Sequence, residues 1–256
     1  IGIGKNADYI RKLFSEAYLD CENLTDSTRF LANELFGNHG LVIIDADDAG
    51  FKKQFAPFVK EELLQNTSFK KVSETIETMK PYDIQVNPRE INLFYMETGL
   101  RERIVFENDV FKINNTPIQF SEDEILDLLD RQPEKFSPNV IMRPLYQEII
   151  LPNLCYIGGG GEIAYWLELK GFFDAVGVTF PMLLVRNSVL LSTEKQSGKA
   201  DKLGLQWRDL FLKPQELANV QIKKHSDFDL DFSEQKDFLR KQFDKLFDIA
   251  NQTDKS

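Results

Sequence analysis

The feature that most constrains this chain is a stretch of 57 residues, 137–193, that carries almost no charge. It contains three basic and four acidic side chains, about 12% of its residues, whereas charged residues make up 28% of the whole chain. Because burying an unpaired charge is costly, so little charge predicts the interior of an α/β domain. The charged residues that then need an explanation are Arg143, Glu148, Glu162, Glu168, Lys170, Asp174 and Arg186.

Within this stretch the pattern predicts a β-loop-α-β unit of Rossmann-like type. The expected elements are a helix at 144–150, a strand at 153–157, a loop of four glycines at 158–161, a helix at 162–169 and a strand at 181–185. Earlier in the chain we expect helices at 5–19 and 25–35, a buried parallel strand at 41–44, and helices at 50–64 and 69–79. Thr25, Asp26 and Ser27 are the candidate caps of the second helix.

Four segments follow from this pattern. Residues 1–80 and 137–230 are the two parts of a Rossmann-like α/β core, and 81–136 form an inserted antiparallel β region that ends in a helix opened by a Ser121–Glu124 capping box. Residues 231–256 begin a coiled-coil helix with one apolar face. That face carries Leu239, Phe243, Leu246 and Ala250.

Composition excludes several classes of function. Lys and Arg number 31 against 41 Asp and Glu, a net charge of −10, which argues against a protein built to hold nucleic acid. Two cysteines and two histidines are too few for a disulfide framework, a structural metal or a metal cluster, and suit a reducing cytoplasm. The longest apolar run, 180–185, is far shorter than the roughly 20 residues of a membrane helix. NAD and haem are not expected.

The glycine loop is the most informative candidate site. Gly158, Gly159 and Gly161 let backbone approach a ligand closely, but the pattern is not G-x-G-x-x-G. Glu162 starts the next helix, where its carboxylate would repel a phosphate. A ligand with an amine beside Glu162 fits this charge better. The alternative is a tight turn with a helix-capping glutamate.

Other candidates lie near predicted strand ends or on neighbouring helices. Arg186, followed by Asn187 and Ser188, comes directly after a predicted strand and offers a planar fork for a carboxylate or phosphate. An ion pair with a nearby acid is the alternative. The remaining candidates are Arg143 with Gln147; Tyr165 and Trp166, as pocket walls or core; and Asp45, Asp47 and Asp48, as ligands of Mg²⁺, an amine or a hydroxyl, or as helix caps.

Several motifs match a known family. They are Asn87-Pro88-Arg89-Glu90-Ile91-Asn92-Leu93-Phe94-Tyr95, the blocks Phe136-Ser137-Pro138-Asn139 and Arg143-Pro144-Leu145-Tyr146-Gln147-Glu148, then Gly161-Glu162-Ile163-Ala164-Tyr165-Trp166, and Arg186-Asn187-Ser188. On these residues the chain resembles the bacillithiol biosynthesis cysteine-adding enzymes, the BshC family of cysteine ligases. Gly160 stands where family members often have proline.

The resemblance implies a core similar to nucleotidyltransferases and class I aminoacyl-tRNA synthetases, with a connective insertion and a dimerising C-terminal coiled coil. It implies a ligase that joins the carboxyl group of cysteine to the amine of glucosaminyl malate. Because amide formation from a free carboxylate is uphill in water, ATP with Mg²⁺ is the expected activating system. The resemblance also implies that this chain is an internal fragment, inactive alone, without the N-terminal nucleotidyltransferase-like motif and most of the coiled coil.

On this reading the catalytic residues are Glu162, which holds or deprotonates the amine, and Arg186, which clamps a carboxylate with Arg143. Backbone N–H groups of the glycine loop stabilise developing oxyanion charge. The expected substrate-binding residues are Gly158, Gly159, Gly161, Tyr165, Asn187, Ser188, Arg143, Gln147, Asp45 and Asp47. Two alternatives stay open: a Rossmann-type enzyme that uses a nucleotide-sugar or dinucleotide, and a non-catalytic coiled-coil scaffold.

Overall fold

In the computed structural model the chain forms two compact units, residues 1–187 and 188–256, each described here by itself. Residues 3–226 and 231–253 are described. The sequence pattern had extended the core to residue 230 and begun the coiled-coil helix at 231, whereas the two units divide between Asn187 and Ser188. The last three residues of that predicted coiled-coil range, 254–256, lie outside the described residues.

The helices of the first unit agree with those expected, apart from a short helix at 170–175 that the sequence pattern does not predict. They are α1 (Ala7–Ser15), continued by a π-helical turn (Glu16–Asp20), α2 (Leu24–Phe36), α3 (Ala49–Gln65), α4 (Thr67–Thr78), α5 (Glu122–Arg131), α6 (Arg143–Ile150), α7 (Gly160–Glu168) and α8 (Lys170–Ala175). The expected caps of α2 are wrong. Asn23 caps this helix instead, because its Oδ1 accepts the Asp26 N–H at 2.9 Å.

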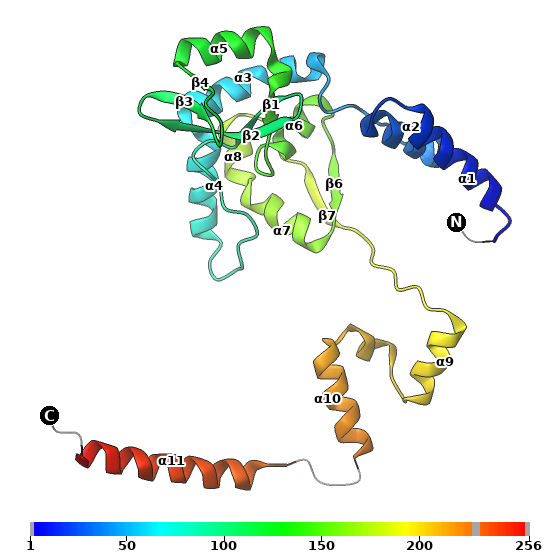
Figure 1. Cartoon of the computed structure of the whole chain (residues 1–256), viewed down its shortest axis with the longest axis vertical. Helices are drawn as coiled ribbons and strands as arrows, with labels where there is room; N and C mark the ends of the chain where they lie inside the picture. Colours follow the sequence, from blue (N-terminus) through cyan, green and yellow to red (C-terminus); the bar gives the residue numbers. More distant parts are fainter. Residues whose placement is uncertain (1–2, 227–230, 254–256) are drawn as a thin grey trace. The chain divides into compact units, whose positions relative to one another are not determined.

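The predicted antiparallel β region is present as a sheet of five strands in the order β4-β3-β2-β1-β5, which extends two residues beyond the predicted end of the region at residue 136. The strands are β1 (Leu93–Glu97), β2 (Leu100–Glu107), β3 (Val110–Ile113), β4 (Gln119–Phe120) and β5 (Phe136–Pro138). The predicted capping box opens α5, with Glu124 Oε2 accepting the Ser121 N–H at 2.7 Å. Helix α5 lies along the β3–β4 side of this sheet (Figure 1).

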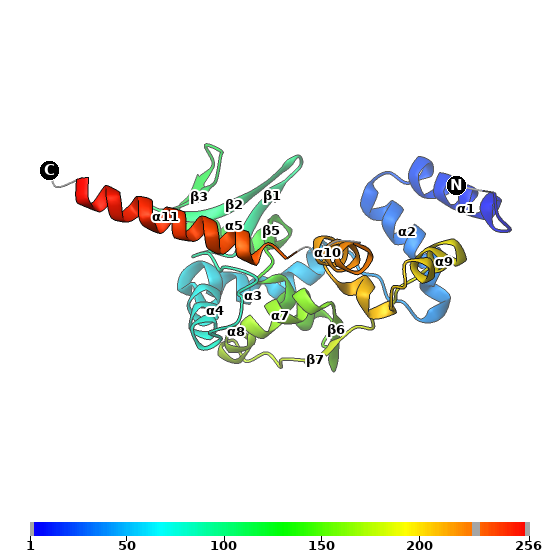
Figure 2. The same cartoon turned by 90° about the horizontal axis from the view of Figure 1, so that it is seen from below.

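One apolar core joins the sheet to α3–α8. It includes a cluster of aromatic rings, in which Trp166 is fully buried and packs near Phe173 and Phe180. Helices α4 and α8 lie side by side in both views (Figures 1 and 2) and approach closely at Gly171. Other core members are Phe55, Val59, Val72, Leu93, Ile104, Phe111, Ile125, Phe136, Leu145 and Phe172.

The predicted parallel pair is present as β6 (Cys155–Gly158) and β7 (Met182–Val185), with Gly158 paired to Val185. The expectation that the charge-poor stretch is interior holds for much of α6–α8 but is wrong for these strands. Helix α7 packs against both strands yet leaves much of their apolar surface exposed. The exposed side chains are Leu154, Ile157, Met182, Leu184 and Val185.

The strand expected at 41–44 is wrong. These residues connect α2 to α3 and pair with no strand among the described residues. An apolar run becomes a strand only where another strand offers hydrogen bonds, and Leu41 and Val42 are exposed instead.

The second unit is helical. It contains α9 (Glu194–Lys202), a 3₁₀ turn (Trp207–Phe211), α10 (Pro214–His225) and α11 (Ser233–Thr253). The predicted long helix is therefore confirmed as α11. Its apolar side chains Phe238, Leu239, Phe243, Leu246 and Phe247 are all exposed.

Candidate functional site

The glycine loop connects β6 to α7 and lies at the carboxyl end of the parallel pair. Gly158 is the last residue of β6 and α7 begins at Gly160. The Gly158 carbonyl accepts the backbone N–H of Arg186 at 2.8 Å, so the residue after β7 is tied to the loop. In open α/β sheets ligands bind at such carboxyl ends. The structure thus brings together the two regions that the sequence analysis had singled out.

Glu162 is held by the loop itself. Its Oε2 accepts the Gly159 N–H at 2.8 Å, and its Oε1 lies 3.4 Å from the hydroxyl of Tyr156. The Gly159 hydrogen bond is the main cause that lowers the pKa of Glu162, and the nearby charge of Arg186 contributes. The side chain is exposed. Glu162 is therefore an ionised carboxylate that faces solvent at the start of α7.

Arg186 lies across the loop from Glu162. A Cβ built on Gly159 would lie 3.5 Å from both Arg186 Nε and Glu162 Oε2, so Gly159 separates the two charged groups. Neither side chain forms an ion pair within the part of the chain that the structure describes. An anion-binding fork and a cation-binding carboxylate are thus available to ligand groups on either side of one glycine.

Arg143 adds a second guanidinium from α6. It donates to the Tyr165 hydroxyl at 2.6 Å and to Gln147 Oε1 at 3.2 Å. All three side chains are half-buried. The Arg143 charge also helps to lower the pKa of Glu162, and the Arg143–Tyr165 hydrogen bond links α6 to α7. Trp166, by contrast, is core: it is fully buried, as one of its two predicted alternatives required.

Tyr156 is a member of this site that the sequence analysis missed. Its ring stacks on Trp166 with centroids 4.2 Å apart. The pKa of Tyr156 is raised by burial, and the nearby Tyr165 and Glu162 add to this effect. The sequence contains a signal for Tyr156, because residues i and i+2 of a strand share a face. Tyr156 lies two residues before Gly158 and so shares its face of the strand.

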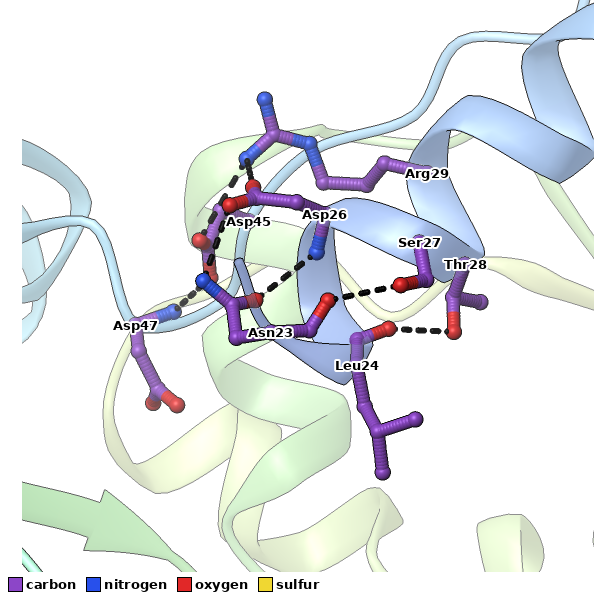
Figure 3. A network of polar contacts seen from close by, with 8 residues as sticks. All are labelled: Asn23, Leu24, Asp26, Ser27, Thr28, Arg29, Asp45 and Asp47. Carbon is purple, nitrogen blue, oxygen red and sulfur yellow. Dashed lines mark hydrogen bonds and ion pairs between the residues drawn. The ribbon is translucent and has the colours of Figure 1, made fainter. Parts of the chain in front are cut away.

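The aspartates after α2 form a separate arrangement. Asp45 accepts the Asp47 N–H at 2.9 Å and lies 3.5 Å from Arg29, which also faces Asp26 (Figure 3). Asp47 lies 3.2 Å from the ammonium of Lys52. Asp48 caps α3, as one predicted alternative had it, through Gly50 and Phe51 N–H groups.

These aspartates do not join the glycine loop directly. Neither Asp45 nor Asp47 hydrogen-bonds to a glycine-loop residue among the described residues. One link runs through α6, because the Tyr146 hydroxyl donates to the Ala46 carbonyl at 2.7 Å. The aspartates adjoin a cavity of about 440 Å³, and Asp47 also lines one of about 640 Å³ beside Glu97 and Lys135. A substrate role for Asp45 and Asp47 stays a prediction.

The remaining candidates have less support. Asn187 is exposed and ends the first unit, and Ser188 opens the second, so their binding roles stay predictions. No group of three metal-ligating side chains occurs in residues 3–226 and 231–253. The loop does not fit a doubly charged nucleotide phosphate, because the Glu162 carboxylate at the start of α7 would repel it. No helix within the described ranges is long and apolar enough to cross a membrane.

Fold and site together define a Rossmann-like α/β domain with a glycine-loop carboxylate, followed by a helical unit. Residues 1–187 match the family model "Bacillithiol biosynthesis BshC, N-terminal Rossmann-like domain", and residues 189–256 match "Bacillithiol biosynthesis BshC, C-terminal coiled-coil domain". The chain belongs to the BshC family. The fold class expected from the sequence is confirmed.

Several curated relatives are named "Putative cysteine ligase BshC". The protein of Flavobacterium johnsoniae is 64% identical over 256 residues, which is 100% of this chain and 48% of the relative. That of Christiangramia forsetii is 52% identical over 258 residues, again 48% of its length. That of Cytophaga hutchinsonii is 36% identical over 94% of this chain and 47% of the relative. The chain thus spans about half the length of the curated relatives that it matches.

Proposed function

We propose that this chain supplies the amine-holding part of the active site of a cysteine ligase. The proposed reaction joins the carboxyl group of cysteine to the amine of glucosaminyl malate, in bacillithiol biosynthesis. One observation carries the proposal: the ionised, exposed Glu162 is fixed by the Gly159 N–H at a strand end, where the charges of Arg186 and Arg143 both act on its carboxylate. The relatives' printed name, "Putative cysteine ligase BshC", and the family's description, bacillithiol biosynthesis, support a cysteine ligase of that pathway.

Glu162 acts as an acceptor that captures an ammonium group. Its pKa is lowered by the Gly159 N–H and by Arg186, which makes the carboxylate a weak base. It therefore holds and orients the amine rather than removing its proton. A proton on an amine with a pKa of about 8 leaves readily to solvent at neutral pH.

Arg186 and Arg143 clamp a substrate carboxylate, from malate or cysteine. In the reaction the amine nitrogen, already neutral, forms the new C–N bond and loses one proton to solvent, while the carboxyl carbon loses its bond to the oxygen of the activating group, which leaves. The N–H groups of Gly160, Gly161 and Glu162 in the first turn of α7 have no acceptor within the helix. They are the donors proposed for the developing oxyanion.

Amide formation from a free carboxylate is uphill in water, so the cysteine carboxyl group must be activated. ATP is the proposed source of this activation. Because the glycine loop does not fit a phosphate, no residue of this chain is assigned to the nucleotide and no step is derived through it. The proposal therefore assigns capture of the amine to this chain and leaves activation of the cysteine carboxyl group unassigned to any of its residues.

The partner proposed for the second unit is another copy of the same protein. Exposed apolar side chains on α11 follow coiled-coil spacing, as at Leu239, Phe243 and Leu246. Sedimentation of the full-length protein tests this proposal. Leu246→Glu is expected to convert a dimer to a monomer, and an unchanged mass would refute it.

The ligase proposal is tested in a bacillithiol-producing strain that lacks the full-length gene and is complemented with variants. Bacillithiol and glucosaminyl malate are measured by mass spectrometry. Glu162→Gln is expected to lower bacillithiol by about tenfold or more, because a neutral amide cannot form an ion pair with an ammonium. Glucosaminyl malate then accumulates.

Glu124→Gln is the matched control. Glu124 also reaches back to the N–H before its helix, at 2.7 Å, but belongs to α5 rather than to the glycine loop. Both substitutions remove the same kind of capping carboxylate, so similar small changes in melting temperature are expected. Wild-type bacillithiol in a well-folded Glu162→Gln strain would refute the assigned role, and normal thiol levels in the deletion strain would refute the ligase itself.

A further inference from the structure

Both oxygens of Glu162 have a partner within the site. Oε2 accepts the Gly159 N–H at 2.8 Å, while Oε1 lies 3.4 Å from the Tyr156 hydroxyl. A carboxylate held at one oxygen can still rotate, whereas one held at both has a fixed plane. The Gly159 contact belongs to helix capping. The Tyr156 contact needs a separate explanation, since capping does not require it.

The ring of Tyr156 is held rigidly. It stacks on Trp166 at 4.2 Å with an interplanar angle of 26°, and Trp166 is fully buried among Phe173 and Phe180. The hydroxyl therefore has a defined position beside the carboxylate. Rotating the phenol away would break this aromatic stack.

Gly158 makes room for this arrangement. A Cβ at Gly158 would lie 2.7 Å from Tyr156 Cε1 and 3.2 Å from Glu162 Cβ. Any larger residue would push the phenol or the glutamate out of place. The φ of Gly158 is not in the left-handed region, so space rather than backbone conformation requires glycine here.

We propose that Tyr156 is a positioning residue, whose hydroxyl donates to Glu162 Oε1 and orients the carboxylate for capture of the substrate amine. The proposal deepens the ligase function and rests on it for the identity of the amine. Because Glu162 is exposed, the held carboxylate stays open to solvent, where an ammonium can approach. Gly158 has no side chain and so leaves the space that this contact requires.

The first test measures activity in the full-length protein. Tyr156→Phe keeps the aromatic ring and removes only the hydroxyl, so the fold is expected to be retained. Loss of one hydrogen bond to a charged group predicts a rise in KM for the amine substrate of about three- to tenfold. Tyr95→Phe is the control, because Tyr95 also donates to a glutamate, Glu97, outside the glycine loop.

The second test reads the pKa of Glu162 and needs no activity. The side-chain carboxyl carbons are labelled with ¹³C, and Glu162→Gln identifies the resonance. The hydroxyl of Tyr156 is one of the groups that lower this pKa, so Tyr156→Phe is expected to raise it, and Tyr95→Phe to leave it unchanged. The acid limb of the activity profile then shifts to higher pH.

The two tests separate two kinds of failure. If the wild-type protein forms no amide but Tyr156→Phe raises the pKa of Glu162, the ligase proposal fails and the positioning contact stands. If the ligase is active and Tyr156→Phe changes neither the pKa of Glu162 nor KM, the positioning role is overturned.

Discussion

Arg143 and Tyr165 join two helices of the first unit through a hydrogen bond of 2.6 Å from guanidinium to phenol. A second N–H of Arg143 donates to Gln147 one turn along α6. Together these bonds fix the plane of the guanidinium. Because this group carries five N–H donors, others remain for a ligand. The direction of the fork is therefore set by how α6 and α7 pack.

Arg143→Lys is expected to lower bacillithiol formation by the full-length protein about ten- to a hundredfold. A lysine keeps the charge but cannot make two directed bonds to Tyr165 and Gln147 while also gripping a carboxylate. The complemented deletion strain supplies the measurement. Arg131→Lys is the control, since Arg131 pairs with Asp127 on the surface of α5. Equal bacillithiol in both strains would contradict a clamp at Arg143.

Local patterns predicted the elements whose partners are close in sequence. The strand–glycine–helix order around Gly158 and the capping box at Ser121 depend on residues a few positions apart, and both are present. The prediction of a strand at 41–44 was wrong because a strand needs a neighbouring strand to pair with. Nothing in these four residues shows whether such a neighbour is available.

Placing the site required tertiary contacts as well. Glu162 and Arg186 could be paired from the sequence because strand ends of a parallel pair meet at one edge. Asp45 and Asp47 were equally plausible site residues, because they also followed a predicted strand. In the structure Asp47 contacts Lys52 rather than the glycine loop. Among the described residues they reach α6 through the hydrogen bond from Tyr146 to Ala46, 100 residues apart, which no local pattern indicates.

Lys52 gives the first unit a pH-dependent stability of known sign. It is only 2% exposed, donates to the Phe136 carbonyl at 2.9 Å and faces Asp47. Burial lowers the pKa of Lys52 below 10.5, so between the folded and unfolded pKa the unfolded chain binds more protons. Stability from this residue therefore rises with pH across that window. Relative to Lys52→Met, the wild type should gain stability from neutral pH toward pH 10.

Urea unfolding at several pH values checks this. The chain has two tryptophans, Trp166 and Trp207, so a Trp207→Phe background lets Trp166 report on the first unit. Lys53→Met is the control because Lys53 is exposed. A difference between the wild type and Lys52→Met that is constant with pH, or that shrinks as pH rises, would contradict the prediction.

Glu62 organises the junction between α3, α4 and β1. It is 1% exposed and accepts the Ser68 hydroxyl at 2.6 Å, the Ser68 N–H at 3.0 Å and the Asn92 N–H at 2.9 Å. Glu62→Ala leaves these buried donors without an acceptor, so a loss of about 2–5 kcal/mol in the free energy of unfolding is expected. Glu61→Ala removes one partly buried contact, to Thr67, and should cost less than about 1 kcal/mol. Equal losses of unfolding free energy in Glu62→Ala and Glu61→Ala would contradict a stabilising role for the buried hydrogen bonds of Glu62.

Alanine substitutions at two glycines in neighbouring helices distinguish a loss of helix packing from a loss of ligand access. A Cβ at Gly171 would lie 2.5 Å from Thr75 Oγ1, between α8 and α4, so Gly171→Ala is expected to destabilise the first unit by about 1–3 kcal/mol. A Cβ at Gly161 meets no atom within 4 Å. Because alanine loses less backbone entropy on folding, Gly161→Ala should stabilise by about 0.4–1 kcal/mol.

The Gly161→Ala variant also tests whether the glycine loop faces a ligand. Since Gly161→Ala fits the fold, any loss of bacillithiol formation in a full-length protein with raised stability must come from the space that the methyl group takes from a bound substrate. Unfolding is followed by Trp166 fluorescence, and product by mass spectrometry. A Gly161→Ala protein that is more stable and fully active would mean that the substrate does not approach the first turn of α7, and the oxyanion role of its N–H groups would be withdrawn.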